Sequence, residues 1–321
     1  MSTATPRKVA QPAPAEVATT RPRRGLRASS TFNFWLFTGP FLIGLVIFVF
    51  VPIVWSMYLS FFEARFTVTP SEFVGFANYK QILTDTDFRN SLVTFTVFAA
   101  FIVPATWALS LGLALLVNRL RFMRAFFRSV FFLPTACSYV AAALIWKMSI
   151  FNGVRFGLAN TILGWFGVEN IAWLANPDPP WYWLVIVTVR LWLQSGFYMI
   201  LFLAALQNIP QELYEAAAID GAKPGWQTFR YITLPQLRAT STAVILLLLV
   251  AAYQAFDEFY NLLSKTTWGQ PPLVELYKMA LGENQNYGAG SAGAVVLTLL
   301  ICLVTLLQGK IMGFGRGEES K

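Results

Sequence analysis

The sequence predicts an all-α integral membrane protein with six transmembrane helices, both termini in the cytoplasm, and a cytoplasmic loop between spans four and five. Hydrophobic residues make up 56% and charged residues 12% of the 321 residues, and this charged share is about half of that in a typical soluble protein. The apolar residues gather in nearly uncharged blocks, each long enough to cross a hydrocarbon layer of about 30 Å. Lysine and arginine concentrate in alternate loops, as expected across a membrane.

Six apolar blocks predict the spans. We expect them at about residues 34–62, 92–117, 129–150, 181–206, 240–263 and 291–312. Prolines inside the first three blocks are compatible with spans, because neighbouring helices and side chains can bond the carbonyl groups that proline leaves free. The chain then divides into an N-terminal tail (1–33), a transmembrane domain (34–313) and a short cytoplasmic C-terminal tail (314–321).

The N-terminal tail is rich in Ala, Pro, Thr and Arg and contains little that could form a core. We therefore expect it to be disordered and cytoplasmic. It does not resemble a cleavable signal peptide, because the apolar block behind it is too long and lacks a small-residue cleavage site.

The orientation follows from the basic residues. Sixteen of the 24 Lys and Arg lie in the two tails and in the loops near residues 119–128 and 223–238, against six in the alternate loops. Cytoplasmic loops carry the excess of positive charge. Both termini and the segment 215–235 are therefore predicted to be cytoplasmic.

Several function classes are disfavoured by composition. The net charge is +8, but the basic residues lie in alternate loops and in the tails, as expected of a membrane protein. No nucleic-acid partner is therefore expected. The chain has no histidine, and its two cysteines, Cys137 and Cys302, lie far apart within apolar blocks. We therefore expect no catalytic residue, no metal site and no redox site.

The segment 215–235, "EAAAIDGAKPGWQTFRYITLP", is polar although it lies between two apolar spans. It predicts a helix that starts at Pro210, with acidic residues near its N-terminus. Gly221 would end this helix, and Pro224 would open a second one. From the residues alone, an ordinary solvated loop remains an open alternative.

The same segment carries a resemblance to a known motif. Glu215-Ala216-Ala217, Asp220-Gly221-Ala222 and "ITLP" (232–235), preceded by "LQNIP" (206–210), resemble the EAA motif of importer permeases in the ATP-binding cassette superfamily. Residues 34–311 resemble the sugar-type permeases of that superfamily, the branch with the maltose and glycerol-phosphate importers; further similarity lies in "FFLPTACSYVAAALIWKMSIFN", "WLANP", "QAFDEFYNLL" and "NYGAGSAGAVV". The chain departs from the pattern at "LPQLRAT" and "TTWGQPP", which weakens inference about the outer gate and the substrate.

This resemblance implies an architecture and a set of partners. The loop at residues 207–238, here called the coupling loop, would fit a cleft on a separate ATPase subunit. The residues that match the contact positions are Glu215, Ala216, Ala217, Asp220 and Gly221. The chain lacks the G-x-x-x-x-G-K-[ST] phosphate loop, so ATP and Mg would be bound by the partner, and this chain would be a transport subunit rather than an enzyme.

The resemblance also implies an assembly in the inner membrane of a prokaryotic cell. We expect a second homologous permease subunit in a heterodimer, two ATPase subunits and an extracytoplasmic solute-binding protein. The assembly would move a sugar or related polyhydroxylated solute by alternating access. A simple sugar, a disaccharide, an amino sugar and a glycerol-phosphate diester all remain open as the solute.

Polar side chains within the spans are candidates for the solute pathway, because charged groups at bilayer depth are costly and usually serve a cavity or a partner. Arg190 and Gln194 are four residues apart on span four, and spacing places Gln254, Asp257, Glu258 and Asn261 on one face of span five. We predict a pathway lined by Arg190, Gln194, Tyr253, Gln254, Asp257 and Tyr139. The alternatives are an Arg190–Asp257 ion pair that fixes packing, or side chains near the mouth that simply contact water.

Two other function classes remain as alternatives. An ion-driven secondary transporter could use Asp257 or Glu258 as a proton site. A membrane-embedded sugar or lipid transferase would need clustered acidic or histidine residues at a membrane face, and the loops offer none. A co-purifying ATPase supports the importer, whereas uptake by this chain alone on a proton gradient supports the secondary transporter.

Overall fold

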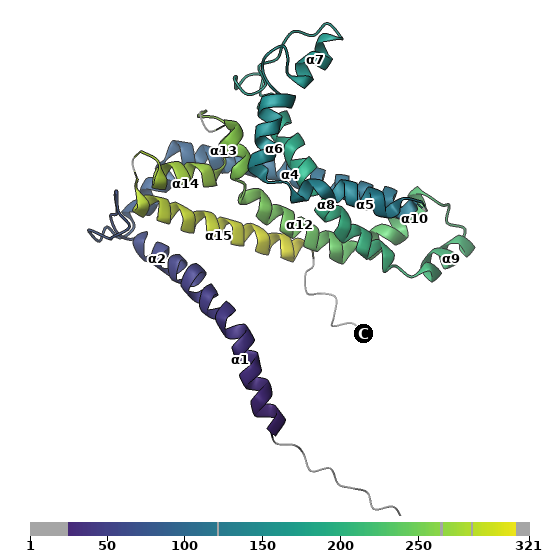
Figure 1. Cartoon of the computed structure of the whole chain (residues 1–321), viewed down its shortest axis with the longest axis horizontal. Helices are drawn as coiled ribbons and strands as arrows, with labels where there is room; N and C mark the ends of the chain where they lie inside the picture. The colour runs from purple at the N-terminus through teal and green to yellow at the C-terminus, as the bar shows by residue number, and fades with distance from the viewer. Residues whose placement is uncertain (1–24, 121, 264–265, 284, 313–321) are drawn as a thin grey trace, which may run out of the picture. The chain divides into compact units, whose positions relative to one another are not determined.

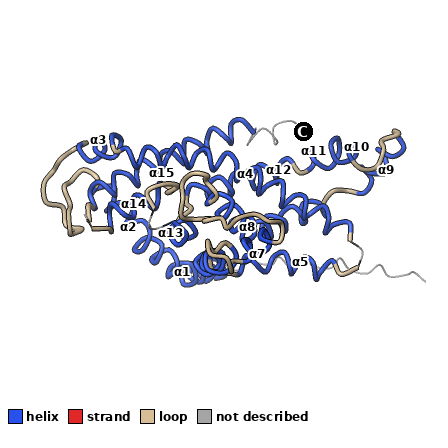
Figure 2. The backbone as a smooth tube through the Cα atoms, turned by 90° about the horizontal axis from the view of Figure 1, so that it is seen from above, coloured by secondary structure: helices blue, strands red, loops and turns tan. Residues whose placement is uncertain are grey.

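The computed structural model describes residues 25–120, 122–263, 266–283 and 285–312, and every regular element in these ranges is a helix (Figure 1, Figure 2). The all-α prediction is therefore confirmed. The chain forms two compact units, Met1–Trp55 and Ser56–Lys321.

From Gly25, where the described residues begin, the first unit is one helical segment. It comprises α1 (Gly25–Leu45), the π-helical turn η1 (Val46–Phe50) and the start of α2 (Val51–Leu59). The π turn lies just before Pro52, which has no N–H and crowds the preceding turn, so the hydrogen bonds widen and the Val51 N–H donates to the Val46 carbonyl. Apolar side chains cover this segment, and Thr31–Leu59 is long enough to cross a membrane. The helix begins at Gly25, ahead of the predicted start, and the predicted disorder of residues 1–24 lies outside the described residues.

Four long helices form the second unit's bundle: α4 (Thr86–Arg119), α8 (Tyr182–Gln207), α12 (Arg238–Tyr253) and α15 (Tyr287–Met312). Helix α4 packs against both α8 and α12, and α15 packs against α12, so the four lie side by side in Figure 1. The apolar side chains on the inward faces form one continuous core. Within the described residues, five segments are long and apolar enough to span a membrane: Thr31–Leu59, Thr86–Arg119, Tyr182–Gln207, Arg238–Leu263, which continues past the end of α12, and Tyr287–Ile311.

The predicted third span is bent rather than straight. It consists of α5 (Arg124–Phe132), the 3₁₀ turn η2 (Leu133–Ala136), α6 (Tyr139–Ile145) and the π turn η3 (Trp146–Ile150). The two halves meet at 95°, so the structure has a sixth span only if this pair is counted as one. Pro134 cannot donate to the preceding turn, and Cys137 and Ser138 adopt extended backbone angles, with ψ of 142° and 137°.

The predicted fifth span is broken near its middle. Helix α12 ends at Tyr253, residues 254–256 are not helical, and α13 (Asp257–Leu263) continues the span. Neither glycine nor proline lies in the break. Its cause is therefore a tertiary contact, which is described with the site below.

Glycine allows α8 to approach the bent third span closely. A Cβ at Gly196 would overlap the carbonyl oxygen of Phe131 on α5, and it would lie 3.0 Å from Phe132 Cα. Because both contacts are backbone atoms, no side chain can move aside to make room. The bend and α8 are thus held at a distance that only glycine permits.

Short helices lie at the two ends of the second unit (Figure 2). At one end are α3 (Ala77–Thr84) and α14 (Pro272–Leu281), which both pack against α15. At the other end, between α8 and α12, the coupling loop forms α9 (Gln211–Ile219), α10 (Trp226–Thr228), the π turn η4 (Phe229–Thr233) and α11 (Leu234–Gln236).

The connection between the third and fourth spans contains a short helix, α7 (Leu158–Gly164). Asn160, only 3% exposed, organises this connection. Its amide nitrogen donates to the carbonyls of Asn152, Val154 and Ile171 at 3.1–3.3 Å. Its oxygen accepts from the Ile171 N–H at 3.2 Å and from Trp173 Nε1 at 3.0 Å. One side chain therefore holds together a segment that has little apolar core.

Candidate functional site

The coupling loop has the predicted order of helix, glycine turn and helix. Helix α9 follows Pro210 and ends before Asp220 and Gly221. Gly221 has a φ of +84°, and the Ala222 N–H donates to the Ala217 carbonyl at 2.9 Å. This left-handed turn is how glycine commonly ends a helix. The prediction for the first helix is confirmed.

The second helix of the loop begins at Trp226, not at Pro224 as expected. Gly225 lies between Pro224 and the helix, and its φ of +108° is not helical. The Lys223 N–H instead donates to Gln227 Oε1 at 2.8 Å, which closes the turn ahead of the helix. The predicted start at Pro224 was therefore wrong by two residues.

Four of the five predicted contact residues are open to solvent. Glu215, Ala216, Asp220 and Gly221 are exposed, and Ala217 is half-buried. The Tyr214 hydroxyl lies 3.2 Å from Thr233 Oγ1 and ties α9 to the second half of the loop. The loop is thus a braced projection with an accessible surface of small and acidic residues.

Arg190 lies on α8 and is only 2% exposed. Its Nη1 donates to Glu258 on α13, which is also 2% exposed, and the two form an ion pair. Its Nη2 donates to the Ala251 carbonyl on α12 at 2.6 Å. The partner of Arg190 is therefore Glu258, and not Asp257 as in the ion-pair alternative.

Gln194 lies on α8, one turn beyond Arg190, and is 8% exposed. Its Nε2 donates to the Tyr139 hydroxyl at 3.1 Å. Tyr139 is half-buried and begins α6 directly after the bend. The structure thus brings together these two predicted pathway residues where the bent span meets α8.

The predicted residues of span five separate into two groups. Gln254 and Asp257 are exposed. Tyr253 is 2% exposed, and its hydroxyl donates to Thr96 Oγ1 on α4 at 3.1 Å. Contrary to the prediction from the spacing, Glu258 does not share an exposed face with Gln254 and Asp257, because it is buried and pairs with Arg190 beyond the break.

Lys147 was not among the predicted site residues, although it contacts the same region. It lies in η3, and its Nζ donates to the Asn261 carbonyl of α13 at 2.9 Å. The signal in the sequence was a single charge within an otherwise apolar span. Sequence alone could not show its partner, which is a backbone carbonyl more than a hundred residues away.

Comparison with known proteins identifies the family. Residues 105–312 match the family described as "Binding-protein-dependent transport system inner membrane component". The chain is 34% identical over 292 residues to a probable ABC transporter permease protein of Pyrococcus horikoshii, over 88% of this chain and 96% of that protein. It is 31% identical over 316 residues to an arabinooligosaccharides transport system permease protein of Halalkalibacterium halodurans, over 95% of this chain and 97% of that one.

The fold is also similar to that of a solved structure. A chain from the crystal structure of a bacterial ABC transporter involved in the import of the acidic polysaccharide alginate superposes with a TM-score of 0.76. The two are 21% identical, and the match covers 89% of this chain and 98% of that one. These findings confirm the resemblance to sugar-type permeases. The chain therefore belongs to the family of binding-protein-dependent transport system inner membrane components, and it is a multi-pass ABC transporter permease subunit rather than an enzyme.

Proposed function

We propose that this chain is a permease subunit of an ATP-driven importer for a sugar or a related polyhydroxylated solute. The observation that carries the proposal is the exposed, braced coupling loop, in which Glu215 and Ala216 face solvent beside the Gly221 turn. The arabinooligosaccharide and alginate systems among the similar proteins support a carbohydrate solute.

The loop is well placed to transmit work from an ATPase. It directly connects α8, which carries Gln194, to α12, which leads to Gln254. The Tyr214–Thr233 contact stiffens it. Closure of an ATPase pair around α9 therefore moves α8 and α12 together, and this movement opens the solute pathway alternately to each side of the membrane.

The accessible polar groups are proposed to line the pathway. Gln254 and Asp257 are exposed and offer amide and carboxylate groups, and the half-buried Tyr139 adds a hydroxyl that Gln194, 8% exposed, holds in place behind it. Such groups can bond to several hydroxyls of a sugar. Arg190 and Tyr253 were predicted to belong to the same lining. Since both are 2% exposed and bonded within the protein, we assign them to the framework behind the wall.

The remaining partners follow from the topology and the family. We propose that both termini and the coupling loop are cytoplasmic, as the lysine and arginine distribution indicates. Two ATPase subunits would hold ATP and Mg, and a binding protein would deliver the solute from outside. A second homologous permease would complete a heterodimer in the inner membrane, because one chain of about six spans cannot readily enclose a gated path.

Crosslinking from the loop tests this proposal. Ala217→Cys is introduced after Cys137 and Cys302 are replaced by alanine, and the full transporter is treated in membranes with a bifunctional thiol reagent. We expect a crosslink to an ATPase subunit, and none from the matched control Arg155→Cys in the connection before α7. Lack of any crosslink from Ala217→Cys, or its labelling from outside intact cells, would contradict the proposal. Uptake by this chain alone on a proton gradient would favour a secondary transporter.

A further inference from the structure

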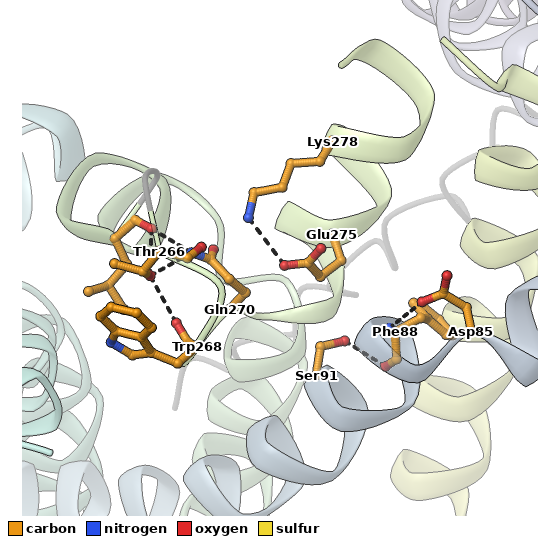
Figure 3. A network of polar contacts seen from close by, with 9 residues as sticks. Asp85, Phe88, Ser91, Thr266, Trp268, Gln270, Glu275 and Lys278 are labelled. Atoms are coloured by element: carbon orange, nitrogen blue, oxygen red, sulfur yellow. Dashed lines mark hydrogen bonds and ion pairs between the residues drawn. The ribbon is translucent and has the colours of Figure 1, made fainter. Parts of the chain in front are cut away.

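Helix α13 is a separate half-helix whose C-terminal end, which is also the end of the span, is capped by side chains. Lys147 Nζ donates to the Asn261 carbonyl at 2.9 Å. Lys147 Nζ also lies 3.5 Å from the Leu262 carbonyl, and the Leu263 carbonyl accepts from Thr266 Oγ1 at 2.9 Å and from Gln270 Nε2. Figure 3 shows Thr266 and Gln270 turned toward each other in this capping cluster. The last carbonyls of a helix have no partner within it, so these side chains stabilise the end of α13.

The break before α13 is held open by Arg190. In a continuous helix, the Ala251 carbonyl would accept from the Ala255 N–H. Here that N–H donates to the Ala252 carbonyl at 3.1 Å, and Arg190 Nη2 donates to the Ala251 carbonyl instead. The same guanidinium pairs with Glu258 beyond the break. Arg190 therefore bonds to both halves of span five.

The break determines which of two adjacent carboxylates is accessible. In an unbroken helix, residues four apart lie on one face. Asp257 would then lie between the buried Tyr253 and the exposed Gln254, and Glu258 between the exposed Gln254 and the buried Ala255, so both carboxylates would flank the exposed face. In the structure Asp257 is exposed, whereas Glu258 is only 2% exposed.

We infer that Arg190 and Glu258 are a positioning pair that selects Asp257, rather than Glu258, as the carboxylate facing the pathway. The pair contacts no solute and acts by keeping span five broken. That this face is the solute pathway rests on the function proposed above. That only one of the two carboxylates is exposed rests on the geometry of the break alone.

Thiol accessibility tests the inference without knowledge of the solute. The full chain, with its partner subunits, is kept in native membrane vesicles, and Cys137 and Cys302 are replaced by alanine. Asp257→Cys is the reporter, and the reaction rate with a small water-soluble methanethiosulfonate is measured with the pair intact and in Arg190→Met/Glu258→Leu. Gln254→Cys, which lies before the break, is the matched control.

Loss of the pair lets span five close into a continuous helix and turns residue 257 toward α4. We expect the rate at Asp257→Cys to fall about tenfold, the factor that corresponds to about 1.4 kcal/mol in favour of the buried arrangement. The rate at Gln254→Cys stays the same. Conversely, when both are measured in an Arg190→Met background, Glu258→Cys reacts faster with the methanethiosulfonate than Asp257→Cys does.

An unchanged rate at Asp257→Cys, or an equal fall at both positions, overturns the inference. If the double variant does not reach the membrane, Arg190→Gln/Glu258→Gln is compared in the same way, because this neutral pair has a shorter side chain at position 190 that loses the bond to the Ala251 carbonyl. An unchanged rate there is equally contrary. The measurement needs neither ATP nor solute. A failed crosslink from Ala217→Cys would therefore overturn the proposed function and leave this inference standing.

Discussion

Removing one member of the Arg190–Glu258 pair should destabilise the protein far more than removing both. Arg190→Met leaves Glu258, 2% exposed, without its partner. An uncompensated buried charge of this kind costs about 3–5 kcal/mol. The Ala251 carbonyl also loses its donor, which adds roughly 1 kcal/mol. We therefore expect the single variant to lose about 4–6 kcal/mol, a large share of a domain stability that totals only about 5–15 kcal/mol.

The double variant Arg190→Met/Glu258→Leu should recover most of this loss. It removes both charges and replaces them with apolar side chains of similar size, an exchange that is often neutral or stabilising. The Ala251 carbonyl can again accept from the Ala255 N–H if the helix closes. We expect the parent and the double variant to have similar stabilities, and the single variant to be much less stable than either.

Thermal unfolding of the purified transporter in detergent, followed by tryptophan fluorescence, measures this order. The matched control is Lys278→Met, because Lys278 pairs with Glu275 on the partly exposed surface of α14 (Figure 3), where such a pair contributes at most about 1 kcal/mol. A single variant as stable as the parent would refute the reasoning. So would a double variant as unstable as the single one, because the loss would then not arise from an unpaired charge.

Three further substitutions test the loop, the α7 connection and the packing. Gly221→Ala places a side chain at a φ of +84°, which costs about 1–2 kcal/mol, so ATP-driven uptake by vesicles should fall. Gly221→Asn should retain more uptake, because asparagine tolerates this conformation; equal uptake by the two variants would count against the role of the turn. Asn160→Ala removes five hydrogen bonds, so limited proteolysis should cut the connection around α7 faster than in an Arg155→Ala control; matching cleavage rates would contradict its organising role. The new Cβ of Gly196→Ala overlaps the Phe131 backbone, so the variant should lose about 1–3 kcal/mol of stability and unfold at a lower temperature. Gly112→Ala on α4, with open space around it, should not change the unfolding temperature. An unchanged unfolding temperature in Gly196→Ala would mean that α5 and α8 do not approach so closely.

Much of the architecture could be predicted from the sequence because the bilayer imposes a simple length rule. An uncharged block of the right length forms a helix wherever it lies. Helix α8 agrees with its predicted span to within one residue, whereas α15 begins four residues and α4 six residues before the predicted start. The glycine turn at Gly221 was also predictable, since a left-handed residue after a run of alanines is a local property. The segment that carries the family motif could therefore be recognised without a structure.

What the sequence by itself determined is local: which segments are helical, which are apolar, and where the coupling loop turns. The tertiary structure alone decided the bend of the third span, the break in the fifth, and which polar groups are accessible. The break shows why. No residue between Gln254 and Phe256 disfavours a helix strongly, yet Arg190, some sixty residues earlier in the chain, takes the Ala251 carbonyl and pairs with Glu258. A hydrogen bond between distant segments outcompetes a local one only after the helices have packed, so helical spacing alone assigned the wrong neighbours to Asp257 and Glu258.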